Sequence, residues 1–186
     1  MKSSRDQLSF EFLKHPTVQW KIRWIQYTLE AISIEYDEWE SPFTRGPGMY
    51  VAIVSGHSIG EFANPMGSNA WPVDLCPCVH AGDERFYDAA WQVARNKDGA
   101  VVISVDGMIH PQLVRFRDPD PEKVTVSDVY ADWMGSRHMS ALDTSAREGV
   151  VTTITLSEET GRVTEFVDGT YVTTDRSDLG KRWRLD

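Results

Sequence analysis

Three short runs of apolar, largely β-branched residues constrain the fold of this chain more than any other feature. They span residues 49–54, 100–105 and 150–156, and Gly, Pro, Asp or Ser residues flank each of them. Runs of this length are typical of buried strands and are too short for ordinary helices. Segments with helical periodicity alternate with these runs. The pattern predicts an α/β domain with a mixed central β-sheet flanked by helices.

The first part of the chain contains one strongly periodic helix. Residues 17–39 carry apolar side chains at steps of three and four, which predicts a helix with one buried face. This apolar stripe consists of Val18, Ile22, Ile25, Leu29 and Ile32. Trp20 and Trp24 are expected to widen it, and residues 4–13 are expected to form a shorter helix. Residues 1–40 are therefore predicted to be an N-terminal helical arm, which either packs on the domain or holds subunits together.

The main domain is expected to span residues 41–175. A Pro/Gly-rich link occupies 41–48, and the long irregular segment 55–82 is expected to be a functional or flexible loop. Asp83 is suited to cap a helix that ends near Asn96. The inward side chains of that helix are predicted to be Phe86, Ala90, Val93 and Ala94.

Two Asp-Gly pairs, at residues 106–107 and 168–169, predict tight hairpins because each lies between two strand-like runs. The paired runs are 100–105 with 108–116, and 162–167 with 170–174.

The rest of the second half is expected to be helical or irregular. Residues 117–123 are predicted to be a loop, 127–134 a short helix, and 136–148 a second helix. Residues 176–186 are expected to be a charged, loose C-terminal tail.

Composition limits the possible partners. The chain has 186 residues, of which 41% are hydrophobic, as expected for one folded domain. It shows neither a membrane-spanning run nor a signal peptide, so a cytoplasmic location is expected. A net charge of -9 argues against general binding of nucleic acid. The few cations must therefore be concentrated locally if the protein binds phosphate, and each Arg near a glycine or a helix start is a candidate.

The charged residues are skewed towards Asp (16 against 12 Glu) and Arg (13 against 6 Lys). An acidic surface poor in Lys suits a salt-adapted host such as an archaeon, and an ordinary acidic cytosolic protein is the alternative.

The only two cysteines form the run Cys76-Pro77-Cys78, with His80 nearby. A zinc site needs four ligands, so this set is incomplete, and two half-buried loop thiols are the simpler interpretation.

A glycine and three polar residues open the helix predicted at 136–148. Gly135 lets an anion approach the backbone, Ser136 can donate to phosphate or cap the helix, and Arg137 adds a fixed cation. His138 is a further donor. The block therefore suits a triphosphate, whereas an ordinary serine cap beside a solvated arginine is the alternative.

Two further blocks contain carboxylates. Asp98 precedes Gly99 and Ala100 at the start of a strand, where a carboxylate can hold Mg²⁺ or Mn²⁺ together with phosphate oxygens. The run Ser-Glu-Glu-Thr-Gly at 157–161 joins two predicted strands. Taken alone, each block is more simply interpreted as a turn.

The order and spacing of the three blocks resemble the diadenylate cyclase family. Its members have Asp-Gly-Ala at the start of a strand, later a Gly-Thr-Arg-His-Arg-x-Ala-like block, then an apolar strand and Ser-Glu-Glu-Thr-Gly. The resemblance covers roughly residues 49–172 and is strongest from Asp98 to Val167.

The resemblance implies the diadenylate cyclase fold and the condensation of two ATP molecules into cyclic di-AMP and two pyrophosphates. It implies that Asp98, Arg137 and His138 are catalytic, with Asp98 also binding a divalent metal ion (Mn²⁺, Mg²⁺ or Co²⁺). The implied nucleotide-binding residues are Gly99, Ala100, Ser136, Arg137, His138, Ser140, Ser157, Glu158 and Glu159. Two subunits are expected to face each other as a homo-oligomer, because each binds one ATP.

This sequence departs from the family pattern at several positions. Met139 stands where many members have a second Arg, and Lys97 where a His often precedes the Asp-Gly-Ala block. The run Arg115-Phe116-Arg117-Asp118 stands where the family often has a Leu-Pro segment that contacts adenine, and Phe116 is a candidate to stack on the base. The segment 55–82 is also longer. These departures motivate an alternative hypothesis, a catalytically silent sensor of ATP or cyclic di-AMP. The third hypothesis is a structural domain whose motif matches are accidental.

Overall fold

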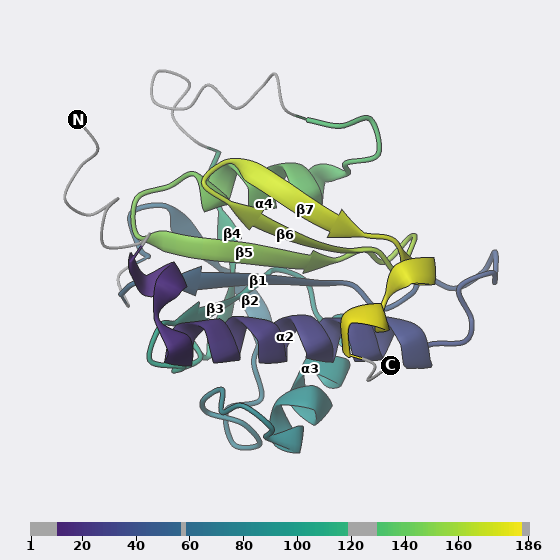
Figure 1. The fold of residues 1–186 in the computed structure, drawn as a ribbon, viewed down its shortest axis with the longest axis horizontal. Helices are drawn as coiled ribbons and strands as arrows, with labels where there is room; N and C mark the ends of the chain where they lie inside the picture. Colours follow the sequence, from purple (N-terminus) through teal and green to yellow (C-terminus); the bar gives the residue numbers. More distant parts are fainter. Residues whose placement is uncertain (1–10, 57–58, 119–129, 184–186) are drawn as a thin grey trace.

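A computed structural model describes residues 11–56, 59–118 and 130–183. Seven strands form one sheet in the order β2-β4-β3-β1-β5-β6-β7 (Figure 1). Their bounds are β1 Met49–Val54, β2 Ala63–Ala70, β3 Ala100–Ser104, β4 Gln112–Phe116, β5 Val150–Leu156, β6 Val163–Val167 and β7 Thr170–Thr174. β1 and β3 pair in parallel and the other neighbours are antiparallel, so the sheet is mixed as predicted.

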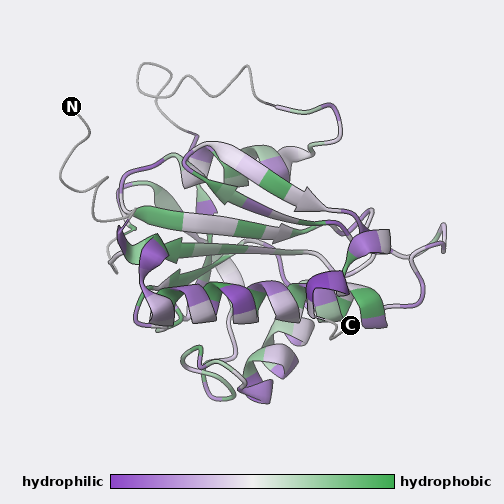
Figure 2. Ribbon diagram, in the orientation of Figure 1, coloured by the Kyte–Doolittle hydropathy of each residue, from purple (hydrophilic) through white to green (hydrophobic). Residues whose placement is uncertain are grey.

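Helices cover both faces of the sheet. α2 (Pro16–Glu35) and α3 (Glu84–Asn96) pack on one face, and α4 (Ser136–Ser145) packs on the other. Alternate residues of β1 divide between two cores: Val51 faces α2 and α3, whereas Ala52 faces α4. Figure 2 shows hydrophobic residues along β1 and β5 in the middle of the sheet. The α/β architecture with a flanked mixed sheet is therefore confirmed.

α2 forms part of the domain core. All five residues of its predicted stripe are buried against the sheet. The prediction for Trp20 was wrong, because this side chain is 63% exposed on the opposite side of the helix. Residues 11–14 are helical, and the rest of the helix predicted at 4–13 lies outside the described residues.

Both predicted hairpins are confirmed. The turn between β6 and β7 has positive φ at Asp168 (49°) and Gly169 (70°), as a tight two-residue hairpin requires. In the other hairpin the Gly107 N–H donates to the Ser104 carbonyl oxygen (2.8 Å), and the regular strand β4 begins only at Gln112.

The segment predicted as a long irregular loop contains strand β2, which the sequence analysis missed. β2 lies at the edge of the sheet: among the described strands it pairs with β4 alone, and its register shifts between Pro65 and Ala70. Its sequence, Ala-Asn-Pro-Met-Gly-Ser-Asn-Ala, lacks β-branched residues, and most of its side chains are solvent-accessible. Proline and glycine are tolerated in a strand at a sheet edge, so hydrogen bonding to β4 defines this strand.

Three predictions about the second half need correction. Residues 130–134, the described part of the helix predicted at 127–134, form a turn. α4 ends at Ser145, before the predicted end at residue 148. Residues 176–183 do not form a loose tail: they contain the 3₁₀ helices η1 (Arg176–Asp178) and η2 (Lys181–Trp183), and Leu179 between them is buried.

Glu30 of α2 holds this C-terminal segment. Its carboxylate is buried and accepts hydrogen bonds from the Gly180 N–H (2.9 Å), Arg182 Nε (3.0 Å) and Trp183 Nε1 (2.9 Å). None of the described helices is long and apolar enough to cross a membrane.

Candidate functional site

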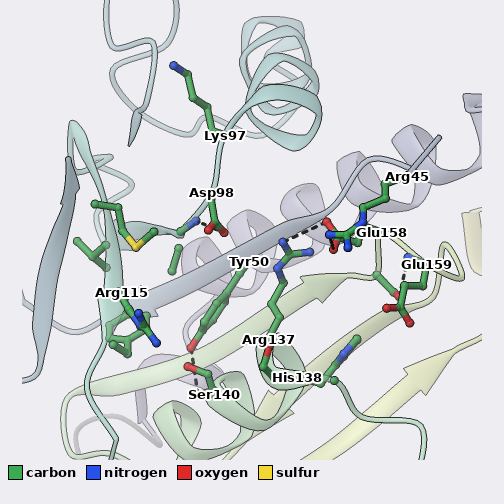
Figure 3. A pocket seen from close by; sticks show the side chains of 18 of the residues that line it. Arg45, Tyr50, Lys97, Asp98, Arg115, Arg137, His138, Ser140, Glu158 and Glu159 are labelled. Atoms are coloured by element: carbon green, nitrogen blue, oxygen red, sulfur yellow. Dashed lines mark hydrogen bonds and ion pairs between the residues drawn. The ribbon is translucent and has the colours of Figure 1, made fainter. Parts of the chain in front are cut away.

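A cavity of about 760 Å³ opens where β1 and β3 begin and β5 ends. These strand ends meet at one edge of the sheet because β1 is parallel to β3 and antiparallel to β5. All ten predicted site residues line the cavity: Asp98, Gly99, Ala100, Ser136, Arg137, His138, Ser140, Ser157, Glu158 and Glu159. Three blocks that are separate in the sequence therefore share one cavity (Figure 3).

Asp98 is exposed at the mouth of the cavity. Its backbone N–H donates to Asn69 Oδ1 (3.0 Å), and its own Oδ1 accepts from the Gly99 N–H (2.8 Å). Gly99 has φ of 102°, and a Cβ atom there would lie 3.2 Å from the Val114 carbonyl oxygen. Only glycine fits this conformation and close approach without strain, so the glycine fixes the direction of the preceding carboxylate.

The amino end of α4 is open towards the cavity. Its N-cap is Gly135, which has no side chain, and Ser136 is the first helical residue. The interpretation of Ser136 as the cap is therefore wrong. The first turn leaves N–H groups without partners inside the helix and carries the positive end of the helix dipole. Such an end suits an anion.

Glu158 holds two guanidinium groups at the cavity. Its Oε2 lies 3.5 Å from Arg137 NH2, and its Oε1 lies 3.2 Å from Arg45 NH1 (Figure 3). A Cβ atom on Gly48 would lie 2.4 Å from Arg137 NH1, so this glycine leaves room for the guanidinium. Arg45 was missed because the link at 41–48 showed no strand or helix pattern. Its place directly before Gly46 is the signal that could have identified it.

His138 is buried among aromatic rings. It is 7% exposed, and its ring centroid lies 5.1 Å from that of Trp133. Burial, with smaller contributions from Arg137 and Arg162, lowers the pKa of His138 to about 4. Its Nε2 atom is buried and has no hydrogen-bond partner in the described part of the chain. A neutral imidazole can donate or accept one hydrogen bond there, but it adds no positive charge at neutral pH.

Aromatic residues form the floor of the cavity. The Tyr50 hydroxyl donates to the Ser140 carbonyl oxygen (3.2 Å), and burial raises the pKa of Tyr50. Phe116 is buried, and its ring centroid lies 5.9 Å from that of Phe62 in a stacked arrangement. One face of the Phe116 ring is therefore already covered. Met139 is half-buried and packs against the core on the α4 side.

Further cations line the same cavity. Arg115 reaches it from β4, and Arg162 from the turn before β6. The Arg162 guanidinium lies 4.3 Å from the centroid of the Trp133 ring, a cation–π contact that holds both side chains. Lys97 also lines the mouth.

A metal ion at this site would depend on a bound phosphate. Within the described ranges, no group of three or more His, Cys, Asp or Glu residues is arranged to hold a metal. Asp98 offers one exposed carboxylate, which fits an ion such as Mg²⁺ or Mn²⁺ that shares its coordination with phosphate oxygens and water. It does not fit a centre built from protein ligands alone.

The cysteine pair lies apart from the cavity. Cys76 is buried, and Cys78 Sγ lies 3.0 Å from His80 Nε2. Both thiols are free; Cys78 is half-buried as predicted, whereas the prediction for Cys76 was wrong because this side chain is fully buried.

Comparison with known proteins gives a structural likeness only. The sequence matches no known family model and no curated protein. A hypothetical membrane spanning protein from Bacillus cereus superimposes with a TM-score of 0.56 and 15% identity, over 82% of this chain. This chain spans 62% of that protein's length. The two share a fold. A double mutant of DacA from Staphylococcus aureus matches with a TM-score of 0.47 and 16% identity, over 84% of this chain and 88% of that one.

Proposed function

We propose that this protein is a diadenylate cyclase, which condenses two ATP molecules into cyclic di-AMP and two pyrophosphates. The observation that carries the proposal is the convergence of the three blocks on one cavity. There the open end of α4 and Arg137 suit a triphosphate, and Asp98 lies at the mouth. A cavity of this size is ordinary for one small-molecule ligand.

The proposed reaction is a double phosphoryl transfer. Each ribose 3′-oxygen forms a bond to the α-phosphorus of the other ATP, the α–β anhydride bond breaks, and pyrophosphate leaves with those electrons. Each 3′-hydroxyl loses its proton. Because one subunit holds one ATP in this proposal, two subunits must bring their cavities face to face.

The residues of this chain contribute position and charge. The first turn of α4, Ser136 and Arg137 hold phosphate oxygens, and Asp98 orients the 3′-hydroxyl and accepts its proton. Asp98 would also hold a divalent ion, which would supply positive charge beside the phosphates. Gly99 and Ala100 leave space for the nucleoside, while neutral His138 offers its Nε2 atom as one hydrogen-bond partner.

A second candidate function is a nucleotide sensor without turnover. The pairing of Glu158 with both Arg45 and Arg137 favours it, because these guanidinium groups are already partly neutralised. Met139 also adds no second cation to α4.

The test is to incubate the protein with ATP and Mn²⁺, Mg²⁺ or Co²⁺, and to separate the products by chromatography. Cyclic di-AMP is expected with at least one metal. Asp98→Asn should abolish product formation while the protein stays folded by circular dichroism. Asp88→Asn, an exposed change on α3, is the matched control and should leave turnover unchanged. ATP binding by calorimetry without any product would overturn the cyclase and favour the sensor.

A further inference from the structure

The edge strand β2 carries a bulge beside the cavity. Its register on β4 shifts between Pro65, which pairs with Val114, and Ala70, which pairs with Gln112. Residues 66–69 therefore lie opposite a single residue of β4 and leave the regular ladder. Bulges are over-represented at sheet edges and next to active sites, where they change the direction of a side chain. This bulge, residues 66–69, is therefore a candidate for a role in the site.

The bulge contacts the Asp98-Gly99-Ala100 block at two points. Asn69 Oδ1 accepts a hydrogen bond from the backbone N–H of Asp98 (3.0 Å), although the two residues are 29 positions apart in the sequence. The Met66 side chain lines the cavity and lies over Gly99: its Cγ atom is 3.1 Å from the place that a Cβ atom on Gly99 would take. The bulge therefore lies directly against the residues that precede β3.

Both ends of the Asn69 amide are in use, and this fixes its orientation. Nδ2 donates to the Met66 carbonyl oxygen (2.9 Å) within the bulge, while Oδ1 accepts from the Asp98 N–H. One partner is an acceptor and the other a donor, so the reversed amide would satisfy neither. A carboxylate at this position could not donate to Met66, and a hydrocarbon side chain could form neither bond. The amide therefore ties the bulge to the backbone of Asp98.

Gln112 of β4 holds the bulge from the side of the sheet. Its Nε2 donates to the carbonyl oxygens of Gly67 and Asn69, the latter at 3.2 Å. Asn69 is half-buried, whereas Asp98 is exposed. The exposed Asp98 backbone is therefore held by a residue that is itself fixed to β4.

We propose that Asn69 is a positioning residue, which holds the Asp98 backbone so that the Asp98 carboxylate points at the 3′-hydroxyl of ATP. This inference rests on the proposed function, in which Asp98 accepts the proton of that hydroxyl. Asn69 acts through Asp98 and not on ATP itself, and the phosphates are held by α4 and Arg137. Loss of the Asn69 amide should therefore lower the rate of the chemical step and leave ATP affinity unchanged.

Asn69→Ala tests the proposal with two independent measurements. In amide hydrogen exchange followed by NMR, the Asp98 N–H should exchange faster than in the wild type, while the amides of β1 and β3 keep their protection. In steady-state formation of cyclic di-AMP, kcat should fall by roughly ten- to a hundredfold with the KM for ATP within about twofold, because a small misplacement of a reacting group costs rate.

Asn96→Ala is the matched control. The Asn96 amide is also exposed near Asp98, but it donates to the Gln92 carbonyl oxygen (3.1 Å) at the end of α3. Its removal should change neither the exchange of the Asp98 N–H nor kcat.

Three outcomes in Asn69→Ala would overturn the positioning role alone. A wild-type kcat would make the bond to Asp98 merely structural, and unchanged exchange of the Asp98 N–H would show that Asn69 does not hold it. Faster exchange throughout β1 and β3, with a raised KM, would show a general loss of structure instead. Absence of cyclic di-AMP from the wild type with every metal is a different result, because it would overturn the proposed function and this role with it.

Discussion

At the scale of single residues, the carboxylate of Glu158 organises the cations of the cavity. Arg137 comes from the first turn of α4 and is mostly buried, whereas Arg45 comes from the link before β1 and is exposed. Removing a charge-assisted contact costs more where water is excluded, because water cannot replace it. The two arginines therefore differ in their expected contribution to phosphate binding.

We predict that Arg137→Ala weakens ATP binding by about tenfold or more, which corresponds to the loss of a charge-assisted hydrogen bond. Arg45→Ala should weaken it by only a few-fold. Isothermal titration calorimetry with ATP measures both values. Arg95→Ala on α3 serves as the control for removing an arginine from the surface, and unchanged affinity in Arg137→Ala would contradict its role.

His138 makes a second prediction at this scale. Its pKa in the folded protein, about 4, lies below the ordinary value of 6.5, so the unfolded chain binds the proton more readily. The stability contribution is fully present above pH 6.5 and is lost as the pH falls towards 4. We expect wild-type stability to fall more steeply in this window than that of His138→Gln, by up to roughly 1.4 kcal/mol per pH unit. Urea unfolding at several pH values measures the difference, and parallel curves for the two proteins would refute it.

At the scale of elements, α2 connects the sheet to the C-terminal segment. The Glu30 carboxylate accepts hydrogen bonds from the backbone and side chains of residues 180–183 while it is itself buried. Leu179 adds apolar burial next to it. A buried carboxylate with these donors holds the segment in place, because an unsatisfied charge there would be costly.

We predict that Glu30→Gln lowers the free energy of unfolding by about 1 to 3 kcal/mol, because hydrogen bonds to a charged group are lost. It should also make residues 176–183 more accessible to trypsin, which cleaves at their Lys and Arg residues. Denaturant unfolding and limited proteolysis test both effects. Glu61→Gln, at an exposed position, is the control and should change neither the stability nor the rate of cleavage. If Glu30→Gln were as stable and as resistant to trypsin as the wild type, the role given to the Glu30 carboxylate would be wrong.

At the scale of the whole molecule, the two faces of the sheet have different roles. The α4 side and the adjoining sheet edge carry the cavity, whereas α2 on the other side holds the C-terminal segment through Glu30. The proposed reaction needs a second copy of the chain, whose cavity faces the first.

The sequence by itself determined most of the local structure. Runs of β-branched residues predicted the inner strands, and Asp168-Gly169 predicted a tight turn, because strand periodicity and positive φ are properties of neighbouring residues. The buried stripe of α2 was predictable for the same reason. The ten site residues could be chosen from the order of the three blocks.

Tertiary structure decided what depends on contacts between distant residues. β2 exists as a strand because β4 lies beside it, and Trp20 is exposed because the sheet covers only one side of α2. The pairing of Arg45 with Glu158 joins two loops far apart in the sequence. Helical periodicity states which residues share a face, but only packing determines which neighbour covers that face. For this reason the sequence identified the blocks, whereas the fold alone brought them to one cavity.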